Sequence, residues 1–296
     1  MNETRQKGSF TFDDANSKRV SYVMPTKNRA GFLAGALKGV RGLKGLEDEL
    51  ILIDGGSTDD TLAIVEQNRD LIDIFVSEPD KEAFEAGNKG IMLARGKFVY
   101  IAADDDIIYR EGMGKAIDVL ESNPQIDMII CGGIRKFGNH LKKPFYIPPG
   151  TNYGSKPGDT FFYKACGMGA VYRRKTFVKF GLFDSIAADL DMPTRIIYRG
   201  GQVRFCRVNL FLHTLYKHSV VVSKKRAYRK ECFRIARAYC SRTFYVNYLI
   251  SQLIIIPVRR FYRRALEFII IRILKKSLKL ICLIIFASLN FLGSLV

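Results

Sequence analysis

Three consecutive aspartates, Asp104, Asp105 and Asp106, directly follow the apolar run that begins at Tyr100. Carboxylates placed side by side at the end of a buried segment repel one another, and the repulsion grows as water is excluded. A bound cation relieves it, and Mg²⁺ or Mn²⁺ typically takes one or two carboxylates together with substrate phosphates. The triplet therefore indicates a metal site for a phosphorylated ligand, with a solvated acidic loop as the alternative.

The segments before and after the triplet alternate between short apolar runs and helix-like stretches. Strands are expected at 20–24, 49–54, 73–76, 97–102 and 126–131, and helices at 30–40, 58–67, 82–94 and 111–122. This alternation is typical of an α/β domain with a mostly parallel sheet. Ligands of such sheets bind at the carboxyl ends of the strands, where Asp54, Glu78, Asp80 and the triplet all fall. The acids are therefore expected to share one edge of the sheet.

Other sequence signals exclude several classes of protein. The first strand is not followed by Gly-x-Gly-x-x-Gly, and no GxxxxGK[ST] is present, which argues against a dinucleotide-binding Rossmann domain and a P-loop. The six cysteines lack CxxC spacing, so we expect reduced thiols rather than a disulfide framework or zinc site. The polar N-terminal segment lacks the apolar core of a signal peptide. Residues 132–158, rich in Gly and Pro, predict a long irregular connection, and helices at 175–180 and 187–198 close the globular part.

Several short motifs occur in a fixed order along residues 19–200. They are Met24–Arg29, Ile53–Thr61, Ser77–Lys81, Phe84–Gly90, Ala94–Phe98, the aspartate triplet, Gly181–Asp184 and Ile186–Asp191. In this order they resemble the inverting glycosyltransferases of family 2, which have the GT-A fold. The resemblance implies a Rossmann-like sheet flanked by helices and the transfer of a sugar from a nucleotide-diphosphate donor.

The resemblance also assigns roles to the residues of the donor edge. Pro25, Thr26 and Asp54 correspond to positions that hold the nucleoside, with Asp54 as the acid that recognises the base; Arg29 belongs to the same motif. Asp80 and Lys89 correspond to donor contacts near the ribose and diphosphate, although Lys89 also fits a solvated helix lysine. Asp104 would contact both donor and metal. Because alanines stand where the family often has its first acid, either Asp104 with Asp105 or Asp104 with Asp106 would hold Mn²⁺ or Mg²⁺.

A further carboxylate, Asp189, aligns with the general base of the family. Inverting transfer needs one base for the acceptor hydroxyl, since a cation stabilises the departing diphosphate. Asp191 is expected to pair with Arg195, four residues later. The alternative for Asp189 is that it only stabilises the start of a helix through the helix macrodipole. The segment Cys166–Gly169 lacks the His-Gln pair common in relatives. His213 or His218 would complete the metal site. The alternative is that these histidines have a structural role.

The C-terminal quarter carries most of the net charge of +18, because residues 220–296 contain sixteen Lys or Arg and two acids. The uncharged stretches 243–258 and 280–296 are short for a bilayer span. Basic stripes at 259–266 and 272–281 face apolar residues, as in helices that lie in an anionic membrane interface. Two in-plane helices or one bent helix fit this pattern. Packing on the protein's own core is the alternative, and the Ile- and Leu-rich composition argues against nucleic acid.

The sequence thus predicts a polar segment at 1–18, a GT-A domain at 19–222 and a basic amphipathic, membrane-associating helical region at 223–296. The predicted function is metal-dependent, inverting hexosyl or N-acetylhexosaminyl transfer from a UDP-sugar to a lipid-linked saccharide, in cell-surface polysaccharide assembly. The expected location is the cytoplasmic face of the inner membrane, with peripheral or monotopic attachment. A non-catalytic, membrane-associated nucleotide-sugar-binding or scaffold protein is the alternative, and a nucleic-acid-binding protein is a third.

Overall fold

The structure is a computed structural model that describes residues 18–137, 140–145, 156–163, 167–215, 224–258 and 261–262. It divides into two compact units, Met1–Ser241 and Arg242–Val296. The expectations for residues 1–17, Cys166, His218 and most of the basic stripes between 259 and 281 lie outside the described residues, as does the stretch 280–296.

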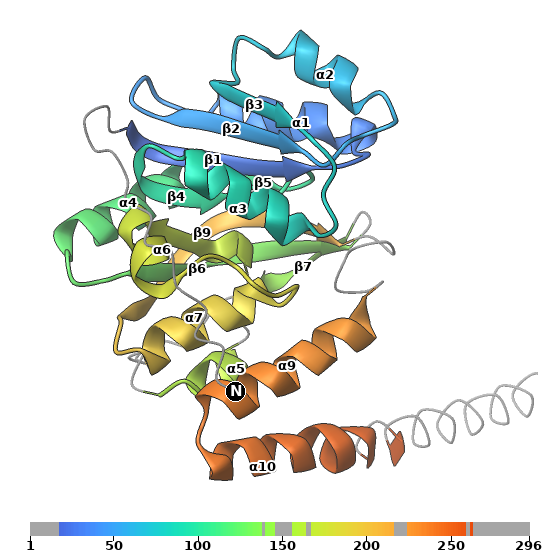
Figure 1. Ribbon diagram of the computed structural model, residues 1–296, viewed down its shortest axis with the longest axis vertical. Helices are drawn as coiled ribbons and strands as arrows, with labels where there is room; N and C mark the ends of the chain where they lie inside the picture. The colour runs from blue at the N-terminus through green and yellow to red at the C-terminus, as the bar shows by residue number, and fades with distance from the viewer. Residues whose placement is uncertain are drawn as a thin grey trace, which may run out of the picture. The chain divides into compact units, whose positions relative to one another are not determined.

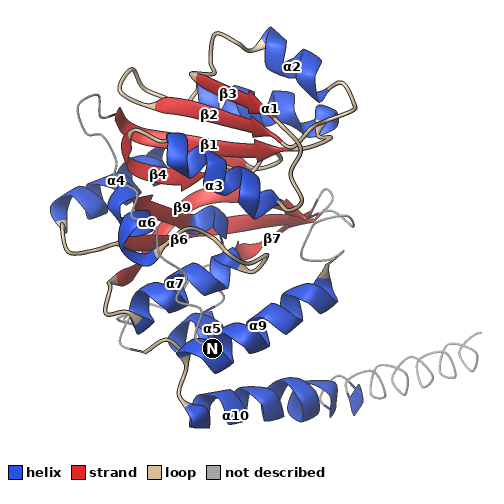
Figure 2. Cartoon of the chain, viewed as in Figure 1, coloured by secondary structure: helices blue, strands red, loops and turns tan. Residues whose placement is uncertain are grey.

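A mixed sheet runs through the first unit (Figures 1 and 2). Its strands are β1 (Lys18–Thr26), β2 (Glu49–Asp54), β3 (Ile74–Ser77), β4 (Gly96–Ile101), β5 (Ile107–Ile108), β6 (Met128–Phe137), β7 (His140–Phe145), β8 (Ala170–Arg173) and β9 (Val203–Leu215). They lie in the order β3-β2-β1-β4-β8-β6-β9-β5, with β7 paired to β6. The first four strands are parallel to one another, and β8 joins β4 antiparallel. The predicted α/β class with a mostly parallel sheet is confirmed.

Helices cover both faces of the sheet. They are α1 (Ala30–Arg41), α2 (Thr61–Gln67), α3 (Ala83–Leu93), α4 (Arg110–Ser122), α5 (Asp159–Tyr163), the 3₁₀ turn η1 (Gly167–Gly169), α6 (Arg174–Phe180), α7 (Ala188–Tyr198) and α9 (Lys225–Tyr239). Buried residues of α1, α2 and α4 belong to one apolar cluster, and those of α3, α6 and α7 to a second. The result is a three-layer arrangement with two cores.

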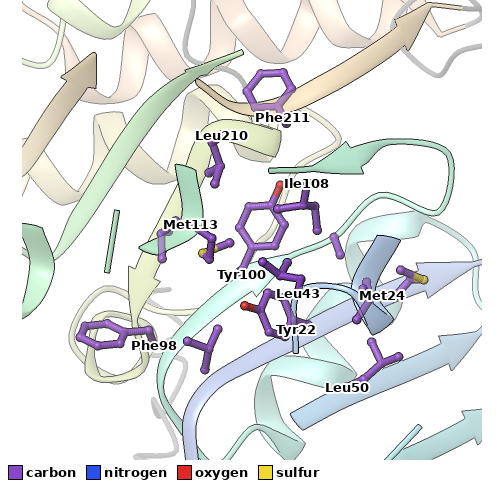
Figure 3. Packing of buried hydrophobic residues seen from close by; sticks show 14 of the residues in the cluster. Tyr22, Met24, Leu43, Leu50, Phe98, Tyr100, Ile108, Met113, Leu210 and Phe211 are labelled. Atoms are coloured by element: carbon purple, nitrogen blue, oxygen red, sulfur yellow. The ribbon is translucent and has the colours of Figure 1, made fainter. Parts of the chain in front are cut away.

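The alternation of side chains along β1 explains how one strand serves both cores. Tyr22 and Met24 belong to the first cluster, whereas Val23 points into the second, as the period of two in a strand requires. Figure 3 shows Tyr22 and Tyr100 of the neighbouring β4 in the first core. On the other face, a Cβ at Gly90 of α3 would lie 2.2 Å from the Cγ1 atom of Val23, so α3 approaches β1 closely only because residue 90 is glycine.

The predicted irregular connection at 132–158 is wrong where the structure describes it as strand. There β6 continues to Phe137 and pairs antiparallel with β7, with a register shift between Ile134 and Lys136. The glycines Gly132 and Gly133 lie inside β6. A Cβ at Gly133 would lie 2.6 Å from the ring of Phe211 in β9. This glycine therefore makes room for the Phe211 ring and does not mark a loop.

The second unit contains α10 (Arg242–Ile250), a π-helical stretch (Ser251–Ile255) and a short helical continuation. Apolar side chains of this unit are exposed: Val246, Ile250, Leu253, Ile254, Ile255, Val258, Phe261 and Tyr262. Among the residues that the structure describes, no helix combines the length and apolar character needed to cross a bilayer.

Candidate active site

The loops after β1 and β2 are tied together at the carboxyl edge of the sheet. Asn28 adopts a left-handed backbone conformation (φ 53°), which asparagine tolerates better than most residues. Its backbone N–H donates to the Ser57 hydroxyl at 2.8 Å, and its side-chain oxygen accepts from the backbone N–H of Thr58 at 2.8 Å. The next N–H, of Arg29, donates to the hydroxyl of Thr61 at 2.8 Å. These bonds fix the start of α1 and the position of the Arg29 side chain.

Arg29 reaches across the edge to the first two aspartates of the triplet. Its Nε lies 3.3 Å from Asp104 Oδ1, and its Nη2 lies 3.0 Å from Asp105 Oδ2. Asp104 is 7% exposed, and the Thr26 hydroxyl at the end of β1 helps to stabilise its ionised form. The structure therefore brings together three predicted donor residues, one from β1, one from the following loop and one from the end of β4.

The third aspartate contacts a residue of β9. Asp106 is 4% exposed, and both its carboxylate oxygens lie 3.1 Å from Nδ1 of His213. Strand pairing explains this contact, because Ile107 of β5 pairs antiparallel with Leu212 of β9 and the preceding residue then lies opposite His213. The structure therefore places His213 beside the triplet, and His218 lies outside the described residues.

Burial raises the pKa of the first two aspartates of the triplet. Desolvation raises the pKa of Asp104 to about 6, although Arg29 and Thr26 favour the ionised form. Desolvation also raises the pKa of Asp105, and the charge of Asp106 adds to this effect, while Arg29 and His213 oppose it. In the part of the chain that the structure describes, Arg29 and His213 lie against these carboxylates.

The donor chemistry of this cluster fits a hard divalent cation. Carboxylate oxygens and one imidazole nitrogen are ligands that Mn²⁺ accepts, and Mg²⁺ accepts the oxygens. Within the described ranges, however, no three or more His, Cys, Asp or Glu side chains converge as a complete metal shell. Among the described residues, Asp106 and His213 form a pair of possible ligands, and substrate phosphates and water would supply others.

Asp54 lies at the carboxyl end of β2, as predicted, but its carboxylate is turned into its own loop. It accepts hydrogen bonds from the backbone N–H groups of Gly56 and Ser57 and from the hydroxyls of Ser57 and Ser77. Burial raises its pKa, but these hydrogen bonds outweigh the burial and the net shift is downward. Recognition of a base by Asp54 stays a prediction, and it would require these bonds to rearrange.

A second acid, Asp80, occupies the space beside Asp54. A Cβ on Gly55 would lie 2.5 Å from Asp80 Oδ2, so the carboxylate sits where any side chain at residue 55 would project. The ammonium group of Lys27 lies 3.3 Å from Asp80 Oδ1 and 3.1 Å from its carbonyl oxygen. Asp80 is thus held close to the loops that follow β1 and β2.

The remaining donor-side residues lie on or against α3. The ammonium group of Lys89 pairs with the Glu78 carboxylate at 2.8 Å, and its contact with a donor stays a prediction. Pro25 packs near Gly87 of the same helix. Asn88 donates to the Phe183 carbonyl at 2.7 Å and accepts from the Phe183 N–H at 3.0 Å, which ties α3 to the segment before α7.

Asp189 stands in the first turn of α7, the helix that packs against α9 (Figure 1). The Tyr228 hydroxyl of α9 donates to its two oxygens at 3.0 and 3.2 Å. The residue as a whole is partly exposed, but desolvation of its carboxyl raises the pKa of Asp189 to about 6 against the opposing effect of Tyr228. Asp191 instead pairs with Arg195 at 3.3 Å, as the sequence predicts.

The turn η1 connects the Asp189 region to the strand that ends in the triplet. A Cβ on Gly167 would lie 3.5 Å from the Cβ of Asp189. The next residue, Met168, accepts a 2.7 Å hydrogen bond from the Tyr100 hydroxyl of β4 through its carbonyl. The Asp189 carboxylate, with a pKa raised to about 6, and the acidic cluster at the sheet edge are thus linked through η1.

A family model settles the relationship of the chain to known proteins. The model described as glycosyl transferase family 2 matches residues 21–181, which include the donor-side loops, the aspartate triplet and η1. The chain belongs to glycosyl transferase family 2. The family named from the sequence motifs is therefore confirmed.

Curated relatives of this glycosyltransferase include a PGL/p-HBAD biosynthesis glycosyltransferase of Mycobacterium bovis. It is 26% identical over 215 residues, a match that covers 69% of this chain and 75% of that protein. Glycosyltransferase GlyG of Streptococcus pneumoniae is 26% identical over 152 residues, covering 50% of this chain and 44% of that protein.

Solved structures share the fold. The S. aureus TarS 1–349 structure in complex with UDP-GlcNAc superposes with a TM-score of 0.59 at 17% identity, over 74% of this chain and 65% of that chain. The mannosyltransferase PcManGT from Pyrobaculum calidifontis, in complex with GDP-Man and Mn²⁺, gives a TM-score of 0.56 at 19% identity, over 78% of this chain and 68% of that chain. The GT-A-like architecture of the glycosyltransferase is therefore established.

Sequence reasoning missed Asn88 and Tyr228 as residues of this site. Asn88 lies inside one of the quoted motifs, and a polar amide on a buried helix face is the signal that would have marked it. Tyr228 lies in the basic segment that was interpreted as membrane-associating, and no local pattern connects it with Asp189. Only the packing of α9 on α7 reveals the contact.

Proposed function

We propose that the protein transfers a sugar from a nucleoside diphosphate sugar, in the first place a UDP-sugar, to an acceptor hydroxyl with inversion at the anomeric carbon. The observation that carries the proposal is Asp189: a carboxylate whose pKa is raised to about 6, oriented by Tyr228 and held beside η1 in a family 2 glycosyltransferase. A base needs a pKa near the working pH, and the raised pKa of Asp189 meets this condition.

In the proposed reaction Asp189 acts on the acceptor. Its ionised carboxylate takes the proton of the acceptor hydroxyl while that oxygen forms a bond to the anomeric carbon of the donor. The bond between this carbon and the diphosphate oxygen breaks from the opposite face, and its electron pair leaves with the diphosphate. One displacement inverts the configuration, so a second catalytic carboxylate of the kind used by glycosidases is not required.

The donor would lie along the carboxyl edge of β1, β2 and β4. Arg29 and Lys27 offer positive charge toward phosphates, and Asp80 offers a carboxylate toward ribose or base hydrogen-bond donors. Asp106 and His213, with Asp104 or Asp105 nearby, would hold Mn²⁺ or Mg²⁺. Such a cation, when bound, neutralises charge that develops on the departing diphosphate. The neighbour structures with UDP-GlcNAc and with GDP-Man and Mn²⁺ support this class of ligand.

The acceptor is proposed to be a lipid-linked saccharide at the cytoplasmic face of the membrane. Support comes from the C-terminal quarter, with its excess of Lys and Arg and the exposed apolar side chains of the second unit. Apolar and basic residues together favour an anionic membrane interface. A membrane-bound enzyme would meet a lipid-linked acceptor by diffusion in two dimensions.

Nucleotide release from a panel of UDP-, GDP- and dTDP-sugars tests the proposal. The wild-type protein is expected to release nucleotide from one donor, with activity lost in EDTA and restored by Mn²⁺ or Mg²⁺. Asp189→Asn should retain nucleotide binding and lose turnover by at least a hundredfold, whereas Asp118→Asn, which changes an exposed acid of α4, should retain both. Undiminished turnover in Asp189→Asn would exclude the base, and binding without release from any donor would favour the scaffold alternative.

Vesicle flotation tests the membrane proposal separately. The full chain is expected to float with vesicles containing anionic phosphatidylglycerol and to float less with pure phosphatidylcholine. A chain that ends at Ser241, the boundary of the first compact unit, should remain in solution. Equal flotation of the two proteins would remove the C-terminal region as the anchor.

A further inference from the structure

The helix α9 makes polar contacts with the region around Asp189 through one side. The residues involved are Lys224, just before the first turn, and Tyr228, Glu231 and Arg234 within the helix. Successive members of this set are four, three and three residues apart. At about 100° per residue these four positions fall within about 120° of one another on a helix. Each of the four contacts a residue of an earlier segment in the same compact unit.

The contacts on either side of Tyr228 fix the helix in place. Lys224 pairs with the carboxylate of Glu82, the residue before α3, at 2.7 Å. At the other end, Arg234 lies 3.7 Å from carboxylate oxygens of Asp184 and of the buried Asp191. Cys232, Ile235 and Ala236 add buried apolar contact. Rotation or sliding of α9 would break these contacts together, so the position of Tyr228 is determined from both directions.

Glu231 supports Asp189 by a second route. Its carboxylate accepts a 2.9 Å hydrogen bond from the hydroxyl of the buried Ser185. The same hydroxyl accepts the backbone N–H of Ala187 at 3.0 Å, and Ala187 is the residue immediately before α7. The helix α9 therefore holds both the backbone turn that leads into Asp189 and, through Tyr228, its carboxylate.

The geometry of the Tyr228 contact suits a carboxylate that must stay ionised and oriented. One O–H group lies within hydrogen-bond distance of both oxygens, at 3.0 and 3.2 Å. Rotation of the carboxylate about its last bond would lengthen one of these contacts. Hydrogen bonds to the charged form of an acid favour that form, and this one acts against the desolvation of Asp189.

We propose that Tyr228 is a positioning residue for the general base, and that α9 is an integral part of the catalytic unit of this enzyme. Tyr228 keeps its proton throughout; it holds the carboxylate so that the lone pairs on the far side receive the proton of the acceptor hydroxyl. The proposal rests on the proposed role of Asp189. It also separates α9 from the remainder of the basic C-terminal region, which follows the boundary at Ser241.

The test compares wild type with Tyr228→Phe, with 3-fluorotyrosine at residue 228, and with Tyr239→Phe. Tyr239 lies on the same helix and packs its ring against Tyr198, so its variant is a matched control for loss of a hydroxyl from α9. The pKa of Asp189 is measured by ¹³C NMR on protein with ¹³C-labelled aspartate carboxyls, and Asp189→Asn assigns the signal. The pH dependence of kcat/KM for nucleotide release is measured on the same proteins.

Tyr228→Phe is expected to raise the pKa of Asp189 and to move the acid limb of kcat/KM to higher pH. It should lower kcat by about ten- to a hundredfold, because a hydrogen bond to a charged group is lost, and leave the donor KM within about twofold. Fluorotyrosine, a stronger donor of the same shape, should lower the pKa of Asp189. Tyr239→Phe should change neither quantity.

Two outcomes overturn the proposal. The first is an Asp189 pKa that is unchanged in both Tyr228 variants. The second is a Tyr228→Phe protein that melts at a lower temperature but keeps the acid limb of kcat/KM at the wild-type pH. The proposed function fails separately, through wild-type protein that releases no nucleotide from any donor. In that case the NMR measurement still decides whether Tyr228 controls the Asp189 carboxyl.

Discussion

His213 Nδ1 lies 3.1 Å from both carboxylate oxygens of Asp106, although the two residues are 107 positions apart in the chain. The antiparallel pairing of β5 with β9 creates this contact, so the last strand of the sheet brings an imidazole to the acidic cluster that follows β4. Asp104 and Asp105 meet Arg29 instead. The three consecutive aspartates therefore divide between two partners, and Asp106 is the one paired with a second potential metal ligand.

This division predicts unequal effects of the aspartates on metal binding. Asp106→Asn and His213→Gln should each weaken Mn²⁺ binding in the presence of UDP by at least about tenfold, since each removes one protein ligand. The double variant should lose little more than the stronger single variant. Electron paramagnetic resonance of free Mn²⁺ measures the affinity directly and does not depend on turnover.

The control is Asp118→Asn, because Asp118 is an acid of α4 with its side chain 71% exposed. The affinity of the Asp118→Asn protein for Mn²⁺ should equal that of the wild type. A His213→Gln protein that binds Mn²⁺ as tightly as the wild type would remove the histidine from the site. If Asp104→Asn lost more affinity for Mn²⁺ than Asp106→Asn, the metal site would have to be placed nearer to Arg29.

The sequence was sufficient to predict the first half of the fold. Apolar runs such as Glu49–Asp54 are short, continuous and separated by helical stretches, so β1 to β4 and α1 to α4 were expected within a few residues of their observed bounds. Local pattern and period carry this information. The placement of the acids at one sheet edge follows from the parallel topology alone.

The second half could not be predicted in the same way because its contacts are non-local. The strand β9 pairs with β6 and β5. Because it mixes charged and apolar residues, its own sequence does not indicate its place in the sheet. The positive charges of Lys224 and Arg234 indicated a membrane surface, yet both pair with carboxylates of the protein itself. Composition gives the sign of a charge, whereas its partner depends on the tertiary fold.

Gly55 gives a prediction about the donor side. In Gly55→Ala the new Cβ would lie 2.5 Å from the Asp80 carboxylate, so Asp80 must move away from its contact with Lys27. Overpacking of this kind costs about 1–3 kcal/mol of unfolding free energy. If Asp80 contacts the donor, the donor KM should rise by severalfold while kcat changes little. Chemical denaturation and steady-state kinetics measure the two effects.

Two further variants separate the clash from the loss of the acid. Gly55→Ala combined with Asp80→Ala should recover the stability, since the crowded carboxylate is gone, but should keep the raised donor KM. Gly114→Ala in α4, where a Cβ meets nothing within 4 Å, should leave KM unchanged and add up to about 1 kcal/mol of stability. A Gly55→Ala protein with wild-type stability and KM would show that Asp80 moves freely and has no part in donor binding.

Asp189 links activity to stability through its raised pKa. As a base it must be ionised, so kcat/KM should fall as the pH decreases through about 6. For stability the sign is opposite: a carboxyl whose pKa is higher in the folded protein than in the unfolded chain favours folding at low pH, and this contribution is lost as the pH rises through 6. Above that pH the folded protein carries a poorly solvated charge.

Asp189→Asn is therefore expected to abolish transfer and to stabilise the protein at pH 8, by at most about 3 kcal/mol for a pKa displaced by about two units. Asparagine resembles the neutral acid and still offers Tyr228 an oxygen acceptor. The stabilisation should shrink as the pH falls below 6 and become small near pH 4, close to the ordinary aspartate pKa of 3.8; it vanishes only below that value, where the wild-type carboxyl is protonated in both states. Urea unfolding at pH 4, 6 and 8 measures the difference, with Asp118→Asn as the exposed control. A pH-independent difference between the Asp189→Asn and wild-type proteins would mean that desolvation does not raise the pKa of this carboxyl, and the placement of a near-neutral base beside η1 would then be wrong.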